Sequence, residues 1–335
     1  MRQPPPARDT DSPRASERSP GASSIRVAVT RPEPLKVVER AYKAREVAPA
    51  EDPLVQAIRA EGLIPVRYPL LRVESEPWAA GLRAAFGRFV PSLARSVQPS
   101  GDRAVSDWQA ERCWLLLTSA NAVAAVHRAL ESDFEILRST VSDGTVRVGV
   151  VGRGTAAAAR AVGLHVSLVP EPFRAAELLR ALIELEGGTE AREVKVLIPQ
   201  SDEGAGDLPA GLRKVGIRVD AVSAYSVVPE PREASRLVDS MKGAEVDVVS
   251  FTSGSALRAL HPALGSSRWP SGVRSAVIGP VTAAVAREHG YPVDIESAEA
   301  TFRGLAAAIA QGSKRAEQVR HSDATEKQGR TRGPQ

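Results

Sequence analysis

The sequence predicts an α/β protein with two doubly wound parallel sheets, and three observations lead to this prediction. The chain has 335 residues, more than a single domain usually holds. Short β-branched or aliphatic runs, such as WLLLT at 114–118, recur along it and precede Ala-, Leu-, Arg- and Glu-rich helical patterns. Several of these segments also occur twice. Wholly apolar strands that alternate with helices are typical of parallel sheets covered on both faces.

The expected strands number about ten, which makes two sheets of about five. They lie, in chain order, at 25–29, 64–73, 114–118, 146–151, 165–169, 194–198, 219–228, 246–251, 273–278 and 292–295. Pro69 interrupts the second run, because proline has no backbone N–H for a sheet ladder. The segment from about 74 to 110 predicts a helix followed by a loop.

The duplication is clearest between SAVIGPVTAAVAREHG at 275–290 and VGVVGRGTAAAARAVG at 148–163, which share eight of sixteen positions without a gap. Two further pairs are 115–130 with 248–260, and 171–184 with 299–310. Two domain arrangements remain open. Either the two halves of the chain fold one after the other, or the chain crosses to a second domain and returns. The unusual length of the runs at 64–73 and 219–228 favours the crossing, with these two segments as a paired linker.

Composition excludes several classes of function. The net charge of +4 comes from the terminal segments 1–24 and 312–335, which carry +1 and +3, so the body is neutral and a nucleic-acid partner is not expected. Both segments lack large aliphatic residues apart from one valine, and we expect them to be disordered tails. One cysteine, scattered histidines and no apolar run of roughly 18 residues indicate a cytoplasmic protein with no metal and no membrane span.

The VVGRGTAAA segment, followed by Glu171, fits a dinucleotide-binding fingerprint, but its copy VIGPVTAA lacks the second glycine. Both copies keep a glycine and a threonine three residues later: Gly152 and Thr155, Gly279 and Thr282. Glycine allows a sharp turn and threonine can cap a helix, so these residues mark either a plain helix start or an anion site made of freed N–H groups.

A second repeated junction places Thr118 and Ser119 after one apolar strand, and Thr252, Ser253 and Ser255 after another. These hydroxyls either cap the following helices or bind a ligand. All four junctions come at carboxyl ends of strands, the edge where doubly wound sheets bind ligands. If the two domains face each other, the junctions line one cleft, and a large polyanionic ligand fits it.

The order and duplication of the motifs VTRPEP, LLLTSANAV, VGRGTAAA with PEPFRAAELL, VDAVSAYSVVP, SFTSGSALRAL and VIGPVTAAVAREHGYPV with ATFRGL resemble the uroporphyrinogen-III synthase family over nearly all of residues 25–311. The resemblance implies two flavodoxin-like domains joined by a two-stranded linker around a cleft. It also implies the crossing arrangement, with one domain at 25–66 plus 229–311 and the other at 72–223.

The same resemblance implies a hydro-lyase without cofactor. Its substrate is hydroxymethylbilane, a linear tetrapyrrole with eight carboxylates, and its products are uroporphyrinogen III, with ring D inverted, and water. We expect a monomer whose only macromolecular partner is hydroxymethylbilane synthase, in transient contact. The alternative is a non-catalytic tetrapyrrole-binding or regulatory module of the same fold. A third interpretation, a nucleotide-dependent oxidoreductase, is supported by Gly152 and Gly154 alone.

Tyr225 lies where the family carries a tyrosine proposed to assist departure of the hydroxyl, although packing is an equal explanation. We expect Arg31 of VTRPEP to contact the substrate, as we expect of the hydroxyl and glycine residues at the four junctions. Gln200 stands where the family commonly has arginine, which weakens a basic contact there. The segment after Pro34 is longer than the family pattern, and the sequence gives it no role.

Overall fold

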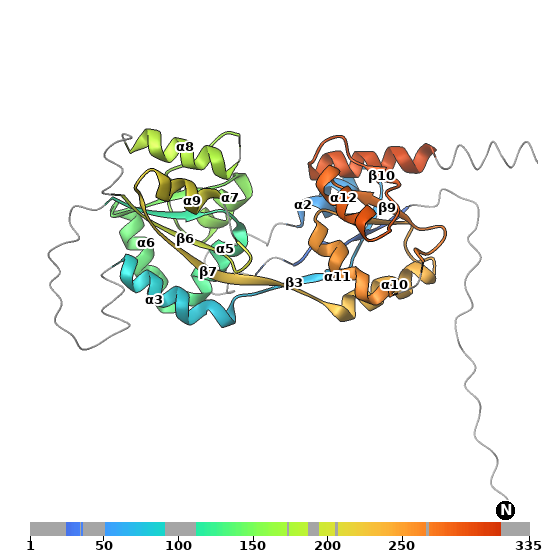
Figure 1. Ribbon diagram of the computed structural model, residues 1–335, viewed down its shortest axis with the longest axis horizontal. Coiled ribbons are helices and arrows are strands. Elements are labelled where there is room, and N and C mark those ends of the chain that lie inside the picture. Colours follow the sequence, from blue (N-terminus) through green and yellow to red (C-terminus); the bar gives the residue numbers. More distant parts are fainter. Residues whose placement is uncertain are drawn as a thin grey trace, which may run out of the picture.

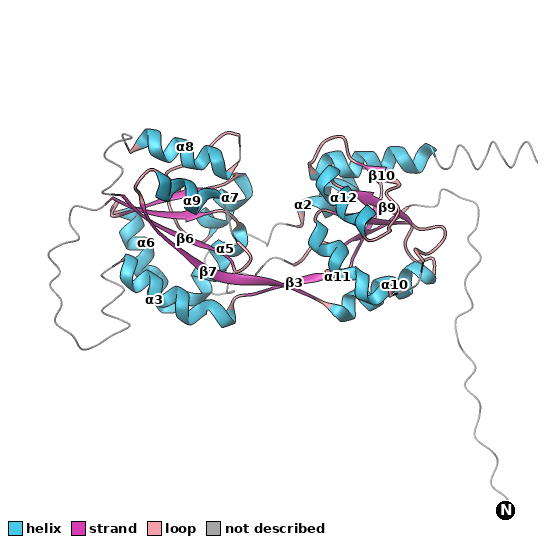
Figure 2. Ribbon diagram, in the orientation of Figure 1, coloured by secondary structure: helices cyan, strands magenta, loops and turns pink. Residues whose placement is uncertain are grey.

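The computed structural model describes residues 25–33, 35, 51–90, 112–172, 174–186, 194–204, 207–265 and 268–315. These residues form two α/β units that lie side by side along the long axis of the molecule (Figure 1). Each unit has a five-stranded sheet with helices on both faces (Figure 2). The predicted fold class, two doubly wound sheets joined by a pair of strands, is confirmed.

The first sheet has the strand order β10-β9-β8-β1-β2, and all its strands are parallel. Its strands are β1 (Arg26–Val29), β2 (Ile64–Arg67), β8 (Val248–Phe251), β9 (Arg274–Val277) and β10 (Ile295–Glu296). One face is covered by α10 (Pro231–Lys242), α11 (Gly254–Leu264) and α12 (Pro280–Glu288). The other face is covered by α2 (Pro53–Ala60) and a helix over 302–315.

The second sheet has the order β3-β7-β6-β4-β5, parallel except for β3. Its strands are β3 (Leu71–Glu74), β4 (Arg112–Leu117), β5 (Val146–Val150), β6 (Val194–Ser201) and β7 (Arg218–Pro229). One face carries α3 (Ala79–Phe89), α5 (Ala120–Leu130), α6 (Phe134–Ser142) and α7 (Arg153–Ala161). The opposite face carries α8 (Ala175–Leu185) and α9 (Asp207–Lys214).

The five apolar residues that follow Arg112 in β4 are explained by this layering. Cys113, Leu115 and Leu117 enter the core beneath α3, α5, α6 and α7. Trp114 and Leu116 point to the opposite core, beneath α8 and α9. Alternate residues of a strand face opposite sides of its sheet, so a strand covered on both sides has no polar position.

The linker consists of β3 and the end of β7, which pair antiparallel from Leu71 opposite Pro229 to Glu74 opposite Ser226. Pro69 separates β2 from β3, and this break lets β2 stay in the first sheet while β3 joins the second. The chain therefore crosses from the first sheet to the second and returns along β7. The domain boundaries expected at residues 66, 72, 223 and 229 stay a prediction.

Two details differ from expectation. Residues 165–169 form no strand but a single bridge between Leu168 and Gly149, and Pro170, which has no N–H to continue the ladder, follows. Residues 312–315, which were expected to belong to the C-terminal tail, instead continue the last helix. Arg274 donates to the Gly312 carbonyl and to the Ser313 hydroxyl, and Ser313 is buried.

Some expectations fall outside the described residues. These are the disorder of 1–24 and of the chain after 315, the loop expected up to 110 and the lengthened segment after Pro34.

Candidate functional site

The carboxyl edges of the two sheets face each other. β2 runs parallel to β1 and continues through residues 68–70 into the other unit. β7 runs parallel to β6 and ends at the first unit, where Glu230 N donates to the Leu70 carbonyl at 2.8 Å. β2 and β7 therefore each run toward the opposite unit. The strands parallel to them run in the same direction, so the carboxyl ends of these strands also point to the opposite unit (Figure 2). This is the edge where doubly wound sheets bind ligands.

Ser119 and Tyr225 are brought together at the edge of the second sheet. Ser119 follows β4 and caps α5, where its Oγ accepts from Ala122 N at 3.1 Å. The same Oγ lies 3.0 Å from the hydroxyl of Tyr225 on β7. The Tyr225 ring is part of the hydrophobic core and only 8% exposed. The residue thus packs through its ring and reaches the polar edge with its hydroxyl.

The hydrogen position in this pair decides what Tyr225 can do. A serine hydroxyl has one hydrogen and two lone pairs, and the Ala122 N–H takes one of the lone pairs. When the Ser119 hydroxyl donates to the Tyr225 oxygen, the phenol hydrogen is free to donate to a ligand. When Tyr225 donates instead, its hydrogen is occupied. The first arrangement makes Tyr225 a positioned proton donor.

The first unit repeats the serine cap without the tyrosine. Ser253 caps α11 and accepts from Ala256 N at 3.4 Å. Ser255 accepts from Arg258 Nη2 at 3.5 Å. Thr252 is half-buried between β8 and this cap, as Thr118 is between β4 and Ser119. The predicted hydroxyl caps at Ser119 and Ser253 are confirmed, whereas ligand contacts of these residues stay a prediction.

The glycines that begin α7 and α12 differ in conformation. Gly152 has φ 84°, ψ 159°, a region that only glycine adopts readily. Gly279 has φ 167°, an extended backbone, and a Cβ there would meet only Ala300 Cβ at 3.6 Å. The expectation that both positions need glycine for a sharp turn is therefore wrong at Gly279. Pro280, whose ring fixes φ in the helical range, starts α12 instead.

Thr155 and Thr282 are the third residues of α7 and α12, and they are only 6% and 5% exposed. Neither helix start has a side-chain cap hydrogen bond, so the capping role expected of these threonines is not observed. The exposed residues of these junctions are Arg153 and Gly154 at α7, and Pro280 and Val281 at α12. Free N–H groups in a first helical turn bind anions, and this property remains at both starts.

Arg31 follows β1 at the edge of the first sheet. Its Nη1 lies 3.1 Å from Asp52 Oδ2, and its guanidinium stacks over the Phe302 ring at 4.2 Å. Asp52 is itself buried as the cap of α2 and accepts from Leu54 N at 2.8 Å. Arg31 is thus held in one orientation, with 24% of its side chain exposed. Its contact with a substrate stays a prediction.

Arg67, the last residue of β2, was not expected from the sequence as a site residue. Its Nε and Nη2 are buried and have no hydrogen-bond partner, and the carboxylate of Glu33 is 3.9 Å away. A buried guanidinium N–H without an acceptor is costly, and an anion would satisfy it. The only signal in the sequence is a single cation at the end of an apolar run, IPVR.

The two units also touch beside the linker. Leu35 N, in the segment that follows β1, donates to Asn121 Oδ1 at 3.2 Å, and the Leu35 side chain packs against the second core. Asn121 belongs to the first turn of α5, next to Ser119. Gln200, near the end of β6, donates to the Gly204 carbonyl in the loop that follows. The segment that follows β1 therefore contacts the same first turn of α5 that Ser119 caps.

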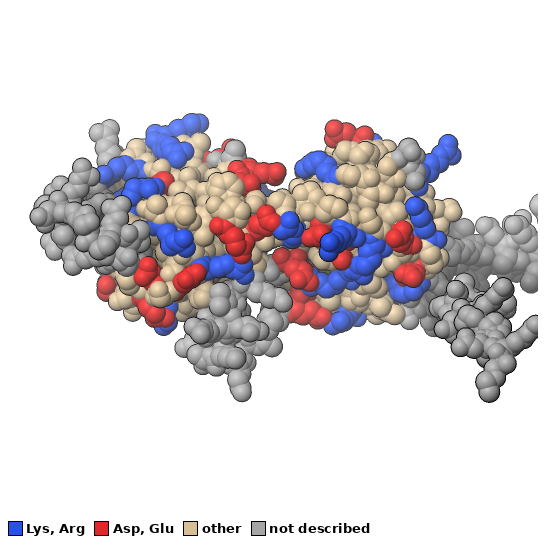
Figure 3. All heavy atoms as spheres, turned by 90° about the horizontal axis from the view of Figure 1, so that it is seen from below, with Lys and Arg blue, Asp and Glu red and all other residues tan. Residues whose placement is uncertain are grey.

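Opposite charges are intermingled where the units meet, as seen from below in Figure 3. Arg72 pairs with Glu74 and with Glu230 at 3.2 Å, and Arg236 pairs with Glu233. Within the described part of the chain, no group of three or more His, Cys, Asp or Glu side chains could hold a metal ion. No helix of that part is long and apolar enough to cross a membrane.

Comparison with known proteins relates the chain to enzymes of tetrapyrrole biosynthesis. Residues 52–307 match the profile of the family described as uroporphyrinogen-III synthase HemD. The uroporphyrinogen-III synthase of Synechococcus elongatus is 30% identical over 260 residues, which cover 72% of this chain and 92% of that protein. A putative uroporphyrinogen-III synthase of Methanothermobacter thermautotrophicus is 33% identical over 195 residues, covering 54% and 74%.

Among solved structures, a mutant uroporphyrinogen III synthase of Thermus thermophilus is 20% identical, with a TM-score of 0.45 and coverage of 88% of this chain and all of that one. The family profile spans most of the chain, and the Synechococcus relative aligns over nearly its whole length. The chain therefore belongs to the uroporphyrinogen-III synthase family.

Proposed function

We propose that this enzyme closes hydroxymethylbilane to uroporphyrinogen III and water, with Tyr225 as the proton donor. The observation that carries the proposal is the 3.0 Å hydrogen bond between Tyr225 and Ser119 at a sheet edge that faces the other unit. A substrate between the two edges meets this phenol on one side and the helix starts of the first unit on the other.

The reaction balances without an oxidant or reductant. The C–O bond of the ring A hydroxymethyl group breaks as the Tyr225 hydroxyl donates its proton, and water leaves while the pyrrole nitrogen supplies electrons. The substituted carbon of ring D attacks the resulting methylene carbon and gives a spiro intermediate. The bond that originally joined this ring D carbon to the bridging methylene carbon then breaks. That bridging carbon next bonds to the unsubstituted carbon on the other side of the ring D nitrogen. The proton lost from the ring at closure returns to Tyr225.

Holding the chain in one folded conformation is the larger part of this catalysis. Orientation of reacting groups in a bound substrate contributes up to about 7–11 kcal/mol to such reactions. The substrate carries carboxylates along its whole length, and the sheet edges offer backbone N–H groups at α5, α7, α11 and α12. Arg31 and Arg67 add two guanidinium groups at the edge of the first sheet. Binding by amides in both units explains why the helix starts are duplicated.

We further propose that the chain acts as a cytoplasmic monomer and receives its substrate in transient contact with hydroxymethylbilane synthase. The support is chemical, because free hydroxymethylbilane closes to the type I isomer without an enzyme. A short path between the two active sites limits this loss.

The test is a coupled assay that starts from porphobilinogen and its deaminase, with the purified chain added and no metal or nucleotide supplied. The expected product is the type III isomer, separated from type I by chromatography of the oxidised porphyrins. A non-catalytic tetrapyrrole-binding module of the same fold would bind the substrate and leave only type I.

A further inference from the structure

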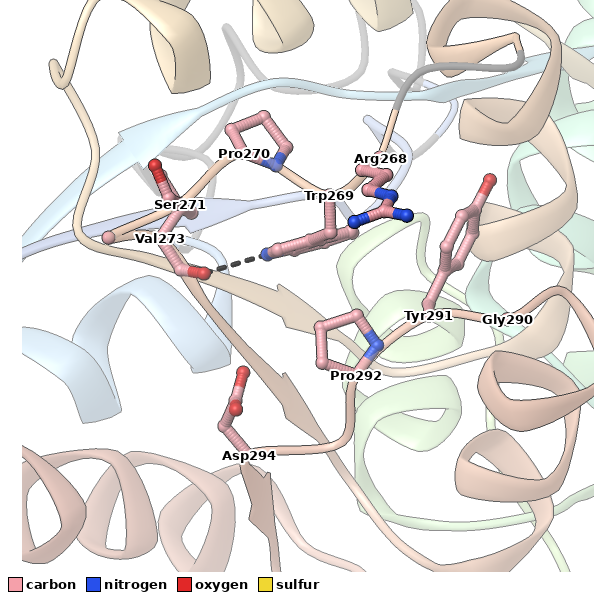
Figure 4. A pocket seen from close by; sticks show the side chains of 10 residues that line it. Arg268, Trp269, Pro270, Ser271, Val273, Gly290, Tyr291, Pro292 and Asp294 are labelled. Atoms are coloured by element: carbon pink, nitrogen blue, oxygen red, sulfur yellow. Dashed lines mark hydrogen bonds between the residues drawn. The ribbon is translucent and has the colours of Figure 1, made fainter.

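A cavity of about 630 Å³ lies in the first unit, away from the candidate site (Figure 4). Its walls come from the segments that precede β9 and β10, so it opens at the amino edge of the sheet rather than at the carboxyl edge. Trp269 and Tyr291 form its aromatic wall, with ring centroids 5.6 Å apart and planes inclined by 51°. Pro270 and Pro292 extend this wall.

Both aromatic rings are fixed by internal hydrogen bonds. Trp269 Nε1 donates to the Val273 carbonyl at 2.7 Å, and the Tyr291 hydroxyl lies 2.7 Å from His261 Nδ1. Burial raises the pKa of Tyr291 to about 12, so this hydroxyl keeps its proton within the hydrogen bond to the imidazole. With their polar ends engaged, the rings present apolar faces to the cavity. Aromatic walls are typical of grooves that bind polyproline II segments.

The first residues that the structure describes lie at the same amino edge of the first unit. Asp247 N donates to the Arg26 carbonyl at 2.9 Å, and Arg274 N donates to the Asp247 carbonyl at 3.0 Å. Arg26 and Arg274 thus begin β1 and β9, which are separated only by β8. Two strand spacings make about 10 Å, and Val273, next to Arg274, lines the cavity. Residue 25 therefore lies close to the aromatic wall.

The segment ahead of residue 25 contains three consecutive prolines, Pro4 to Pro6. The intervening residues 7–24 can reach up to about 60 Å, the extended length of 18 residues, which is more than the distance required. Tethering of this kind gives an effective concentration of about millimolar, which is enough to populate a weak contact. We propose that the cavity binds the Pro4–Pro6 segment of the chain itself in polyproline II conformation. The proposal does not depend on the proposed activity.

The remaining polar groups of the cavity suit this occupant. Polyproline II has no internal hydrogen bonds, so its carbonyls are free to accept from the exposed Arg268 guanidinium. Arg8 follows the prolines, and the Asp294 carboxylate on the cavity wall carries the opposite charge. Ser275 N already donates to one oxygen of Asp294, which fixes the carboxylate. The chain after 315 starts near the same edge but has a single proline, Pro334, and serves as a matched control.

The experiment places a nitroxide label at residue 3 of the full chain through Gln3→Cys and records the indole N–H signal of Trp269 by NMR. Cys113 is buried and reacts poorly. The label should reduce the Trp269 signal by at least about half, given a tethered contact of millimolar strength. The signal of Trp114, which is buried in the second unit, should not change. A label at the other end, through Gln335→Cys, should act more weakly on Trp269.

Two comparisons make the result decisive. Replacing Pro4, Pro5 and Pro6 by alanine in the labelled chain should restore the Trp269 signal, and so should an excess of a synthetic peptide of residues 1–10. A peptide with alanine in place of the three prolines should not. An unchanged Trp269 signal in the labelled chain, or equal loss in the proline and alanine chains, would overturn the proposal.

Discussion

The Tyr225 hydroxyl lies 3.0 Å from Ser119 Oγ, a contact that joins the long linker strand β7 to the first turn of α5. Ser119 holds Tyr225 while it also caps the helix, so one serine couples a structural and a chemical task. Ser253 is its counterpart in the other unit and has only the cap. The two serines therefore form a natural pair of test and control.

Ser119→Ala and Ser253→Ala should each lower the free energy of unfolding by about 1 kcal/mol through loss of a cap. Only Ser119→Ala should also lower turnover, by about 10- to 100-fold, because Tyr225 loses the group that orients it. Urea unfolding and steady-state kinetics of both variants separate the two effects. Equal turnover of the two variants would reduce Ser119 to a helix cap.

Gly152 and Gly279 should respond differently to alanine. Gly152→Ala places a Cβ on a backbone at φ 84° and should cost about 1–3 kcal/mol of unfolding free energy. Gly279→Ala should be tolerated, since its backbone is extended and the nearest atom to a new Cβ is 3.6 Å away. Denaturant unfolding of the two variants checks this, and an equal loss of stability would contradict the difference in conformation.

Arg67→Gln should raise KM by about tenfold with turnover nearly unchanged, because a charge-assisted hydrogen bond contributes about 1.5–3 kcal/mol. Its matched control is Glu33→Gln, which removes the carboxylate 3.9 Å from Arg67 and should lower KM about twofold. If KM stays constant in Arg67→Gln, the guanidinium does not contact the substrate. A common fall of turnover in both variants would instead indicate damage to the first unit.

His127 should make the protein less stable in mild acid. Burial lowers its pKa below 6.5, against a smaller opposing effect of the Glu135 charge, and its Nδ1 has no hydrogen-bond partner. The unfolded chain therefore takes up the proton first as pH falls below 6.5, and the free energy of unfolding decreases until the lower folded-state pKa is passed.

The measurement for His127 is the free energy of unfolding at pH 7.5 and pH 5.5. His127→Gln should lose less stability between these two conditions than the wild-type chain. His165→Gln removes an exposed histidine and should keep the wild-type difference. The interpretation fails if His127→Gln and the wild-type chain lose the same amount.

The elements that the sequence predicts well are those fixed by local chemistry. Apolar runs such as β4 indicate buried parallel strands, and a serine after such a run indicates a helix cap, as at Ser119 and Ser253. The break at Pro69 also follows from the residue itself. These features depend on residues close together in the chain, and so pattern alone reveals them.

The features that the sequence missed depend on distant neighbours. Arg67 is notable only because its N–H groups lie in a buried place without acceptors. Gly279 matches Gly152 in the repeat, yet Pro280 gives the helix a start that needs no left-handed glycine. The bond between Tyr225 and Ser119 joins residues 106 positions apart, and only the order of β7, β6 and β4 in the second sheet brings them together.

The most direct measurement is the rate of type III isomer formation by Tyr225→Phe and wild-type chains from one pool of hydroxymethylbilane. The phenylalanine keeps the buried ring and removes only the hydroxyl. Tyr68→Phe, at a buried tyrosine of the first unit, is the control. We predict a rate about 10²- to 10⁴-fold lower for Tyr225→Phe, with a nearly unchanged melting temperature and type I as the main product. A wild-type rate of type III formation by Tyr225→Phe would contradict the role of Tyr225 as proton donor.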